Sequence, residues 1–247
     1  DLSEGSIKNI PTALRKKLVK KKIQNIKKIN AKTIKGIFHL AAQASVPLSL
    51  KDFYNSSANN LSSSIKVFEL SKKYSAPVVY ASSSAIYGDL PLGNDQIKKF
   101  SILSPYAQDK LTVEDYAKMS FKIFNTSSIG LRLFNVYGPG QKGTGPYSSV
   151  IPIFIDKMLR KKTVLINGGY QTRDFIYVQD VVDIIKKSMN KAQQKRVCEN
   201  FNLGTGKSIK IDTLFNYIKK ITKSNPKLIR KKLAKFDPKK SSGTFKK

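Results

Sequence analysis

Short apolar runs alternate with helix-length segments along most of this chain. The runs are rich in β-branched and aromatic residues and cover residues 36–42, 76–84, 127–138 and 198–204. Helix-length segments lie between them, at residues 55–73, 105–124 and 178–190. Continuous apolar runs are typical of strands buried on both faces, and their alternation with helices predicts parallel pairing. We therefore expect an α/β fold built on a doubly wound parallel sheet.

Two stretches break this alternation, namely residues 141–173 and the tail after residue 205. We expect them to form a smaller lobe over the carboxyl ends of the strands, the edge at which open α/β sheets bind ligands. The predicted sheet domain comprises residues 1–142 and 174–204, and the predicted substrate-binding lobe comprises residues 143–173 and 205–247.

The chain carries 46 Lys and Arg against 16 Asp and Glu in 247 residues, a net charge of +30. Such a charge is typical of proteins that bind nucleic acid or anionic membranes. However, only six of the basic residues are arginines, and lysine lacks the planar fork with which arginine recognises bases and phosphates. We interpret the lysines as solvated surface and expect no nucleic acid and no membrane as partner. A lysine-rich binder of such anions stays an alternative.

The single cysteine, Cys198, cannot form an internal disulfide and has no CxxC partner. The chain contains no run of eighteen uncharged apolar residues, and its first residues, "DLSEGSIKNI", do not look like a signal peptide. We therefore expect a cytoplasmic location and no metal site.

Two glycine-containing stretches match phosphate-binding motifs in spacing but lack their context. "GPGQKG", residues 138–143, contains Pro139 and is not followed directly by a helix pattern. "GTGKS", residues 204–208, ends like a P-loop, but the first glycine of that motif would fall on Phe201. Neither stretch is expected to bind a nucleotide phosphate in the manner of these motifs.

The stretch "SPYAQDK", residues 104–110, places a tyrosine and a lysine one helical turn apart. Ser104 is typical of a helix N-cap and Pro105 of the first helical position, so Tyr106 and Lys110 would share one helix face. A neighbouring ammonium lowers the pKa of a phenol, which allows general acid–base catalysis. Taken alone, the pattern more often marks an amphipathic helix with a half-buried tyrosine and a lysine that reaches solvent.

Further motifs accompany this pair along nearly the whole chain. They are "HLAAQASVPLS" (39–49), "ANN" (58–60), "SSSAIYGD" (82–89), "LRLFNVYGPGQ" (131–141), "YSSVIPIF" (147–154), "QTRDFIYVQDVV" (171–182) and "FNLGTGKS" (201–208). Each is weak singly, but their order and spacing together are specific. The chain resembles the extended short-chain dehydrogenase/reductase family and, within it, the NAD-dependent epimerase/dehydratase group, whose sheet is Rossmann-like.

The resemblance implies a catalytic site and an NAD site. Tyr106 matches the catalytic base, Lys110 the lysine that holds the nicotinamide ribose and lowers the tyrosine pKa, and Ser83 the hydroxyl that bonds to the reacting group. The matches to the NAD site are Leu40, Ala41, Ala42, Gln43, Asn59, Tyr106, Lys110 and Phe134. For Ser83 the alternative is a strand-end serine that caps backbone. We expect His39, the only histidine, to be a core residue of its strand.

The resemblance also implies a nucleotide-sugar site. The residues at positions that face this substrate are Ser83, Tyr106, Asn135, Ser149 and Arg173. The guanidinium of Arg173 suits a diphosphate. The alternative for Arg173 is a surface salt bridge to Asp174.

The start of the chain departs from the family pattern. Members begin with a strand, a GxxGxxG turn, a helix and a second strand, whereas this chain opens with "DLSEG". We expect the chain to begin after that second strand, to stop before the final helix of its relatives, and to be inactive alone. Lys22 falls where relatives carry an aspartate that contacts adenine, which leaves adenine binding open. The choice between NAD and NADP also stays open, because we expect the glycine-rich loop and the ribose-binding residue to lie upstream of this chain.

Ser84 and Ala85 follow Ser83, where dehydratases and decarboxylases of the superfamily carry acidic residues. The resemblance therefore favours a 4-epimerase acting on a UDP-hexose, in which Tyr106 takes the 4-hydroxyl proton and NAD takes the C4 hydride. The 4-keto sugar then rotates in the pocket, so that the hydride returns to its other face and the proton returns to the 4-oxygen. A related dehydratase or reductase, and a non-catalytic relative, stay as alternatives. Family members form homodimers through two helices, here residues 55–73 and 105–124.

Overall fold

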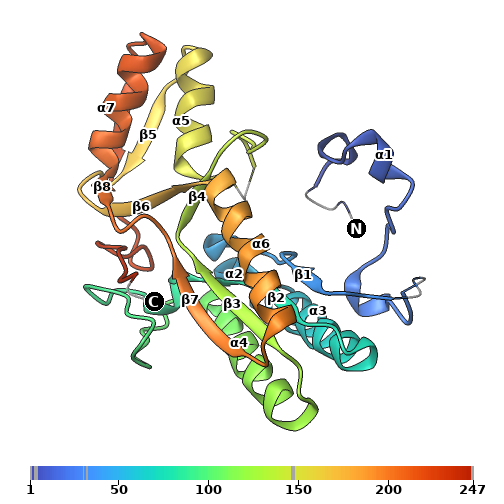
Figure 1. Cartoon of the computed structure of the whole chain (residues 1–247). Coiled ribbons are helices and arrows are strands. Elements are labelled where there is room, and N and C mark those ends of the chain that lie inside the picture. The colour runs from blue at the N-terminus through green and yellow to red at the C-terminus, as the bar shows by residue number, and fades with distance from the viewer. Residues whose placement is uncertain (1, 3–4, 30, 32, 146–147, 246–247) are drawn as a thin grey trace.

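The computed structural model describes the chain except residues 1, 3–4, 30, 32, 146–147 and 246–247. Four parallel strands form its central sheet, in the order β1 (Ile37–His39), β2 (Val78–Ser83), β3 (Ser128–Leu133) and β7 (Cys198–Leu203). Each lies within one of the apolar runs, so the predicted α/β fold with a parallel sheet is confirmed (Figure 1).

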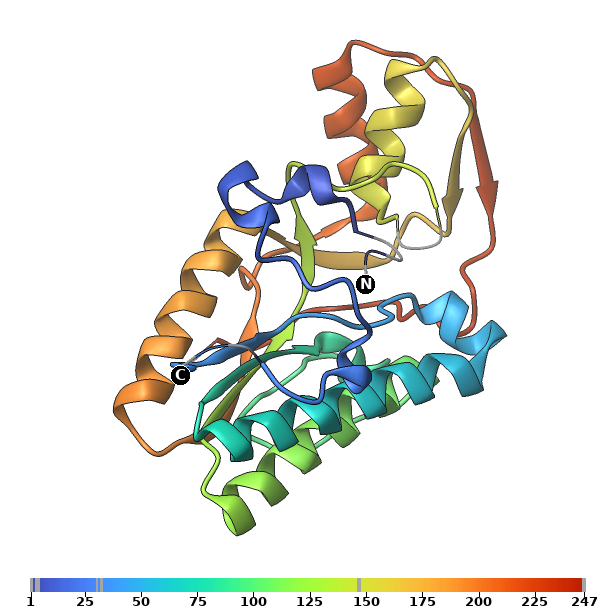
Figure 2. The same cartoon turned by 90° about the vertical axis from the view of Figure 1, so that its right-hand side faces the viewer.

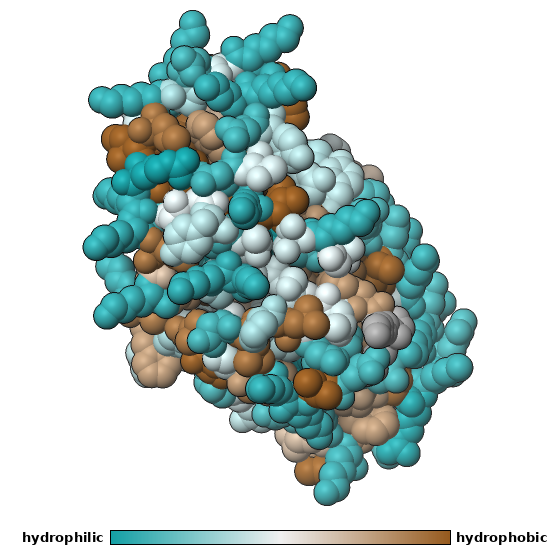
Figure 3. Space-filling view, turned by 90° about the vertical axis from the view of Figure 1, so that its left-hand side faces the viewer, coloured by the Kyte–Doolittle hydropathy of each residue, from teal (hydrophilic) through white to brown (hydrophobic). Residues whose placement is uncertain are grey.

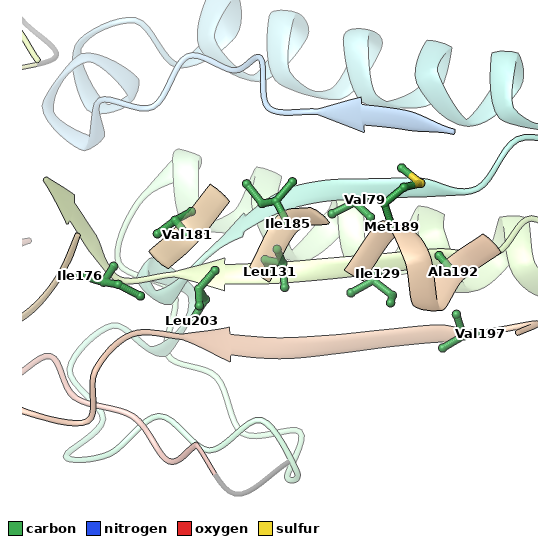
Figure 4. Packing of buried hydrophobic residues seen from close by; sticks show 10 residues of the cluster. All are labelled: Val79, Ile129, Leu131, Ile176, Val181, Ile185, Met189, Ala192, Val197 and Leu203. Carbon is green, nitrogen blue, oxygen red and sulfur yellow. The ribbon is translucent and has the colours of Figure 1, made fainter. Parts of the chain in front are cut away.

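Helices cover both faces of this sheet. Helices α3 (Phe53–Tyr74) and α4 (Pro105–Phe124) lie on one face, and α6 (Val178–Gln194) lies on the other (Figures 1 and 2). Successive strand residues point to opposite faces. Accordingly, Val78 and Tyr80 pack with α3 and α4, whereas Val79 packs with α6. Figure 4 shows the apolar side of α6 against β2, β3 and β7.

A second core lies beyond the central sheet, in the upper part of Figure 1. It joins helices α5 (Val150–Leu159) and α7 (Ile211–Thr222) to a parallel pair of strands, β5 (Val164–Asn167) and β9 (Leu228–Lys231). The rings of Phe154 and Phe215 meet edge to face at its centre, with centroids 5.8 Å apart. This core belongs to the stretches in which the sequence breaks its strand–helix alternation.

A third sheet connects the two cores. The expected strand at residues 127–138 divides at Phe134, because β4 (Asn135–Tyr137) leaves the central sheet and pairs in parallel with β6 (Thr172–Tyr177). Strand β8 (Ser208–Lys210) adds to the other edge of β6 in antiparallel orientation. β7 is an edge strand of the central sheet, and the smaller sheet has the order β4, β6 and β8.

The "GTGKS" stretch forms the turn between β7 and β8. Its backbone is held by the buried carboxylate of Asp174, which accepts hydrogen bonds from the N–H groups of Thr205 at 2.9 and 3.0 Å and of Gly206 at 2.8 Å. These N–H groups are therefore paired with a protein anion. The turn serves the fold and does not act as a P-loop.

The two ends of the chain have little regular structure. Before β1 the described residues contain only short helices: η1 (Ile7–Asn9), α1 (Thr12–Arg15) and η2 (Ile23–Asn25). At the other end, residues 233–245 run as an extended segment, called here the C-terminal strap. Backbone groups of the strap form hydrogen bonds with backbone outside it, through the Ser242 and Lys239 carbonyls and the Ser241 and Thr244 N–H groups.

The surface reflects the lysine-rich composition. Hydrophilic side chains project over much of the face in Figure 3, with hydrophobic patches between them. Cys198 has a free thiol. Among the described residues, no helix combines the length and hydrophobicity that crossing a membrane requires.

Candidate functional site

The first turn of α4 carries Tyr106, and its backbone is fixed from two sides. The hydroxyl of Ser104 accepts a hydrogen bond from the N–H of Ala107 at 3.2 Å, as expected of an N-cap. The hydroxyl of Ser49, in helix α2 (Val46–Lys51), accepts from the N–H of Tyr106 at 3.3 Å. Two otherwise unpaired N–H groups are thereby satisfied. Nothing in the sequence pattern marked Ser49 for this role.

Lys110 lies one turn after Tyr106 and is buried with it, which excludes a lysine that reaches solvent. Its Nζ donates to the carbonyl oxygen of Ala81 at 2.7 Å and lies 5.8 Å from the centre of the Tyr106 ring. Burial lowers the pKa of Lys110 to about 8, against the opposing effect of Asp109. The ammonium has three donors. This hydrogen bond accounts for one of them.

The expected depression of the Tyr106 pKa is wrong for the chain as it stands. Burial raises the pKa of Tyr106 above its ordinary value, a hydrogen bond with Ser83 acts to lower it, and the neighbouring carboxylate of Asp109 raises it further. The reason is that Lys110 directs its ammonium to the Ala81 carbonyl, while desolvation acts on the whole phenol.

Ser83 ends β2 and combines the two roles considered for it. Its hydroxyl accepts from the N–H of Ala85 at 3.1 Å, so it caps the turn η3 (Ser84–Tyr87). The same hydroxyl lies beside the Tyr106 phenol and acts to lower its pKa. Backbone capping therefore positions the serine beside the phenol.

A pocket opens in front of Tyr106, at the carboxyl ends of β2 and β3, and is called here the tyrosine pocket. Four other residues selected from the sequence line it with Tyr106: Ser83, Phe134, Asn135 and Arg173. Its remaining wall includes the turn after Ser83, the stretch from Leu103 to Ser104, and Phe236, Pro238, Lys240, Ser241 and Ser242 of the C-terminal strap. The structure thus brings together predicted site residues that are up to 90 positions apart in the sequence, from Ser83 to Arg173.

Arg173 does not pair with Asp174, so the alternative predicted for it is wrong. Its Nη2 donates to a carboxylate oxygen of Asp237 in the C-terminal strap, and its Nη1 donates to the carbonyl of Thr172 at 2.6 Å. Neighbouring strand residues point to opposite faces, and Asp174 is turned towards the Thr205–Gly206 turn. The guanidinium remains at the wall of the tyrosine pocket.

Three residues selected from the sequence line neither this pocket nor the second pocket described below. The buried Lys110 is one of them. Ser149 is the half-buried residue before α5, and its side chain makes no capping hydrogen bond. Leu40 follows β1 and is 52% exposed. The remaining candidate, Asn135, lines the tyrosine pocket while its Nδ2 donates to the Asp174 carbonyl at 3.2 Å.

A second pocket, called here the Ala41 pocket, follows the end of β1. Ala41, Ala42, Gln43 and Asn59 line it, as does Lys22. The small side chains of Ala41 and Ala42 leave room for a ligand against the backbone. The ammonium of Lys110 has one hydrogen-bond partner among the described residues. Its other donors and these small side chains suit a dinucleotide that extends from this pocket towards Tyr106.

Asn60, next to the predicted Asn59, joins the Ala41 pocket to α4. Its Oδ1 accepts from the N–H of Gln43 at 2.7 Å, and its Nδ2 donates to the Gln43 carbonyl at 3.1 Å and to Asp109 Oδ2 at 3.0 Å. Asn60 is buried, whereas Asn59 is half-buried and lines the pocket. Sequence reasoning missed this residue because both asparagines stand in the same motif.

His39 is a buried strand residue, as expected. Its Nε2 lies 2.9 Å from the hydroxyl of Ser64, while its Nδ1 has no hydrogen-bond partner among the described residues. Burial, with a contribution from the charge of Lys110, lowers the pKa of His39 to about 4. The ring is therefore neutral near pH 7.

A buried ion pair beneath the tyrosine pocket was also missed. Glu114 is fully buried in α4, and its carboxylate accepts from Arg132 Nε at 2.9 Å, from Arg132 Nη2 at 2.7 Å and from Ser82 Oγ at 2.6 Å. Arg132 Nη1 donates to the hydroxyl of Tyr87 at 2.8 Å. The sequence does show one charged residue, Arg132, inside the apolar run of β3 and another, Glu114, on the buried face of α4. It does not show that these two side chains meet.

This arrangement defines a class: a parallel α/β sheet with a buried Tyr–Lys pair, a strand-end serine and a second lobe at the carboxyl edge. A model of the family described as "NAD dependent epimerase/dehydratase family" matches residues 8–204. The chain therefore belongs to the NAD-dependent epimerase/dehydratase family, which confirms the resemblance inferred from its motifs and the cofactor NAD.

Individual relatives agree with this assignment. A protein of Methanocaldococcus jannaschii named "Putative UDP-glucose 4-epimerase" is 37% identical over 198 residues, which are 78% of this chain and 62% of the relative. The chain thus spans less than two thirds of that relative's length. The UDP-glucose 4-epimerase structure from Thermotoga maritima, solved with UDP-glucose, has a TM-score of 0.79 and 32% identity over 86% of this chain and 69% of its own.

A third relative matches over almost the whole chain. The UDP-N-acetylglucosamine 4-epimerase from Methanobrevibacter ruminantium M1, solved with UDP-N-acetylmuramic acid, has a TM-score of 0.86 and 32% identity. The match covers 99% of this chain and 80% of that protein.

Proposed function

We propose that the protein containing this chain is a 4-epimerase of a nucleotide-sugar, acting on a UDP-hexose. The observation that carries this proposal is the tyrosine pocket, in which Ser83, Tyr106 and Arg173 face one space with Lys110 buried behind them. The hydroxyl pair Tyr106–Ser83 suits a reacting sugar hydroxyl, and Arg173 suits a diphosphate. The hydroxyl groups thus suit the sugar end of the substrate, and the guanidinium suits its diphosphate.

Each residue has a distinct role in this proposal. Tyr106 removes the proton of the 4-hydroxyl and later returns it, and Ser83 holds that hydroxyl by a hydrogen bond. When bound, NAD accepts and returns the C4 hydride. Lys110 stabilises the phenolate by its charge and offers its free donors to the cofactor. Residues Ala41, Ala42, Gln43 and Asn59 border the site of the cofactor's other end, and Phe134 and Asn135 border the sugar.

The absence of a carboxylate supports epimerisation over elimination. Ser84 and Ala85 line the pocket beside Ser83, and the described lining contains no Asp or Glu. Elimination of water needs a second acid or base at the neighbouring carbon, whereas epimerisation at C4 needs only one base and a pocket in which the ketone can turn. This argument favours an epimerase within a family whose description also includes dehydratases.

We further propose that the protein is a cytoplasmic homodimer that pairs through α3 and α4. Apolar side chains are exposed on both helices, at Phe53, Tyr54, Ile65, Met119, Ile123 and Phe124. Within each protomer, residues 1–142 with 174–204 would hold NAD, and residues 143–173 with 205–247 would close over the substrate.

The test uses the gene product that contains this chain, with UDP-glucose and UDP-galactose as substrates. We expect either sugar to be converted to the other without net NADH in solution and without solvent deuterium at C4, because the hydride is removed and returned within one cycle. Tyr106→Phe should lower turnover roughly 10²–10⁴-fold. Tyr116→Phe, on the same helix but half-buried against the α3–α4 core, is the control and should retain turnover. Stoichiometric NADH release, or full turnover by Tyr106→Phe, would contradict the proposal.

A further inference from the structure

The C-terminal strap forms one wall of the tyrosine pocket, and its Phe245 packs against the buried residues Ile86, Tyr87 and Phe134. Its backbone is held at two places. At β6, the N–H of Thr172 donates to the Lys239 carbonyl at 3.0 Å, and the N–H of Ser241 donates to the Thr172 carbonyl at 3.2 Å. At the loop after η3, the N–H of Gly93 donates to the Ser242 carbonyl and the N–H of Thr244 donates to the Gly93 carbonyl, both at 2.9 Å.

The side chain of Asn202, on β7, joins the loop and the strap at the second of these contacts. Nδ2 of Asn202 donates to the Gly93 carbonyl at 3.2 Å and to the Thr244 carbonyl at 2.9 Å, so one amide group joins the loop and the strap. Its Oδ1 accepts from the hydroxyl of Tyr87 at 2.7 Å. Asn202 thereby has a defined orientation, because the tyrosine donor selects its oxygen and the two carbonyls select its nitrogen.

The same tyrosine connects the strap to the core beneath the site. The Tyr87 hydroxyl accepts from Arg132 Nη1, and Arg132 is fixed on Glu114 by two hydrogen bonds. Glu114 also accepts from Ser82, the residue before Ser83. A continuous series of polar contacts therefore runs from the helix that carries Tyr106 to the strap that closes the pocket.

The packing at Gly93 leaves this contact little freedom. A Cβ on Gly93 would lie 2.4 Å from the Tyr87 ring, and a Cβ on Gly243 would lie 2.7 Å from the Phe134 ring and 3.0 Å from Asn202 Nδ2. The two glycines form a parallel bridge. The strap can approach Tyr87 and Asn202 this closely because neither residue of the bridge has a side chain.

We propose that Tyr87 and Asn202 are positioning residues that latch the C-terminal strap over the nucleotide-sugar pocket, with the Glu114–Arg132 pair as their fixed anchor. The proposal rests on the proposed function for the identity of the ligand. The latch itself consists of contacts within the chain. Its effect is on binding, since the strap contributes to the wall near Arg173 and not to the proton transfer at Tyr106.

Tyr87→Phe tests the latch, because it keeps the ring against Gly93 and removes only the hydroxyl. Tyr80→Phe is the matched control: Tyr80 is buried in β2 and donates to Asn200 Oδ1 on β7 at 2.7 Å, as Tyr87 does to Asn202. Hydrogen exchange is measured without ligand at the amides of Gly93, Thr172, Ser241 and Thr244. Tyr87→Phe should accelerate exchange at these amides about tenfold, the ratio expected for the net loss of about one hydrogen bond. Tyr80→Phe should leave it unchanged.

Asn202→Ala removes the side chain that bonds to Gly93 and to Thr244 of the strap. It should accelerate hydrogen exchange at the same amides. In the gene product, both latch variants should weaken binding of UDP about tenfold and raise KM for the UDP-sugar more than they lower kcat. Unchanged exchange in Tyr87→Phe or in Asn202→Ala, or equal acceleration in Tyr80→Phe, would overturn the latch. If UDP fails to bind the wild-type protein, the proposed function fails, while the exchange experiment still decides the latch.

Discussion

Lys110 illustrates how burial and chemistry are linked at single residues of this site. Its ammonium is held near Tyr106 by a hydrogen bond to the carbonyl of Ala81. Burial lowers its pKa to about 8, so the positive charge that would stabilise a phenolate is kept at neutral pH at a cost in stability. A lysine that reached solvent would avoid this cost, but its charge would be screened from the phenol.

This cost predicts a pH dependence of stability. Because folding lowers the pKa of Lys110 from 10.5 to about 8, the unfolded chain binds more protons between these pH values, and the folded chain gains stability as pH rises. From pH 7 to 9.5 the wild-type chain should gain about 2 kcal/mol relative to Lys110→Met. Denaturant unfolding at both pH values measures the difference. Lys122→Met, at an exposed position of the same helix, is the control. It keeps Lys110, so its stability should rise with pH as much as that of the wild-type chain. If the wild-type chain gains as much stability relative to Lys122→Met as relative to Lys110→Met, the assignment to Lys110 is refuted.

His39 predicts the same trend in the acid range. Its pKa is lowered from 6.5 to about 4, so the unfolded chain takes up the proton first as pH falls, and the folded chain loses stability. Between pH 7 and 4.5 the wild-type chain should lose about 2 kcal/mol relative to His39→Gln, which cannot be protonated in this range. Unfolding curves at the two pH values provide the measurement, and parallel losses in both proteins would contradict the prediction.

At the scale of elements, helix α4 is the part that joins chemistry to the core. One face of it carries Tyr106, Asp109, Lys110 and Glu114, all of which are buried. Asp109 is bonded to Asn60 on α3, and Glu114 is bonded to Arg132 on β3. The helix is thus fixed by polar contacts on both sides of the catalytic turn, which limits its movement relative to the sheet.

Removing one partner of the Glu114–Arg132 pair should destabilise the fold strongly, whereas replacing both by apolar residues should destabilise it little. Glu114→Gln leaves a buried guanidinium without its counter-charge, and we expect the free energy of unfolding to fall by about 3–5 kcal/mol. The double variant Glu114→Leu/Arg132→Met should recover most of this loss, because both charges are removed together. Asp115→Asn, at an exposed ion pair with Lys118 on the same helix, should change stability little. Chemical denaturation of the four proteins tests the expectation, which fails if the double variant is as unstable as Glu114→Gln.

At the scale of the whole molecule, the charge of +30 acts against self-association. Two copies of such a chain repel each other at low salt, and added salt screens this repulsion. An interface must therefore rely on apolar contact. The exposed apolar residues of α3 and α4 offer such a contact, and they lie on the face of these helices that the central sheet does not cover.

The proposed dimer makes a measurable prediction for the gene product. Light scattering at tens of micromolar should give the mass of a dimer, and the dimer should become tighter with moderate salt. Ile123→Glu, at a residue 62% exposed on α4, should shift the mass to that of a monomer. Ile221→Glu, at a residue 79% exposed on α7, is the control and should leave the mass unchanged. A monomeric wild-type protein would contradict the proposal.

Local patterns in the sequence determined the elements and the family of this protein. The apolar runs became β1, β2, β3 and β7, and the predicted segments around them became α3, α4 and α6. Strand and helix periods depend on neighbours within a few residues, so they can be read directly. Motif order along the chain was sufficient for the family, and the Ser104–Pro105 start was sufficient for the position of Tyr106.

Only the tertiary structure decided the partners of the polar residues and their protonation. Arg173 binds Asp237, 64 residues away, rather than its neighbour Asp174. Asn60, and not Asn59, joins Gln43 to Asp109, and Glu114 meets Arg132. Such pairs depend on which faces of distant elements pack together. The pKa of Tyr106 depends likewise on burial, which raises it above its usual value despite the lysine one turn away. Spacing along the chain records that two residues share a helix face, but desolvation is set by everything that packs against that face.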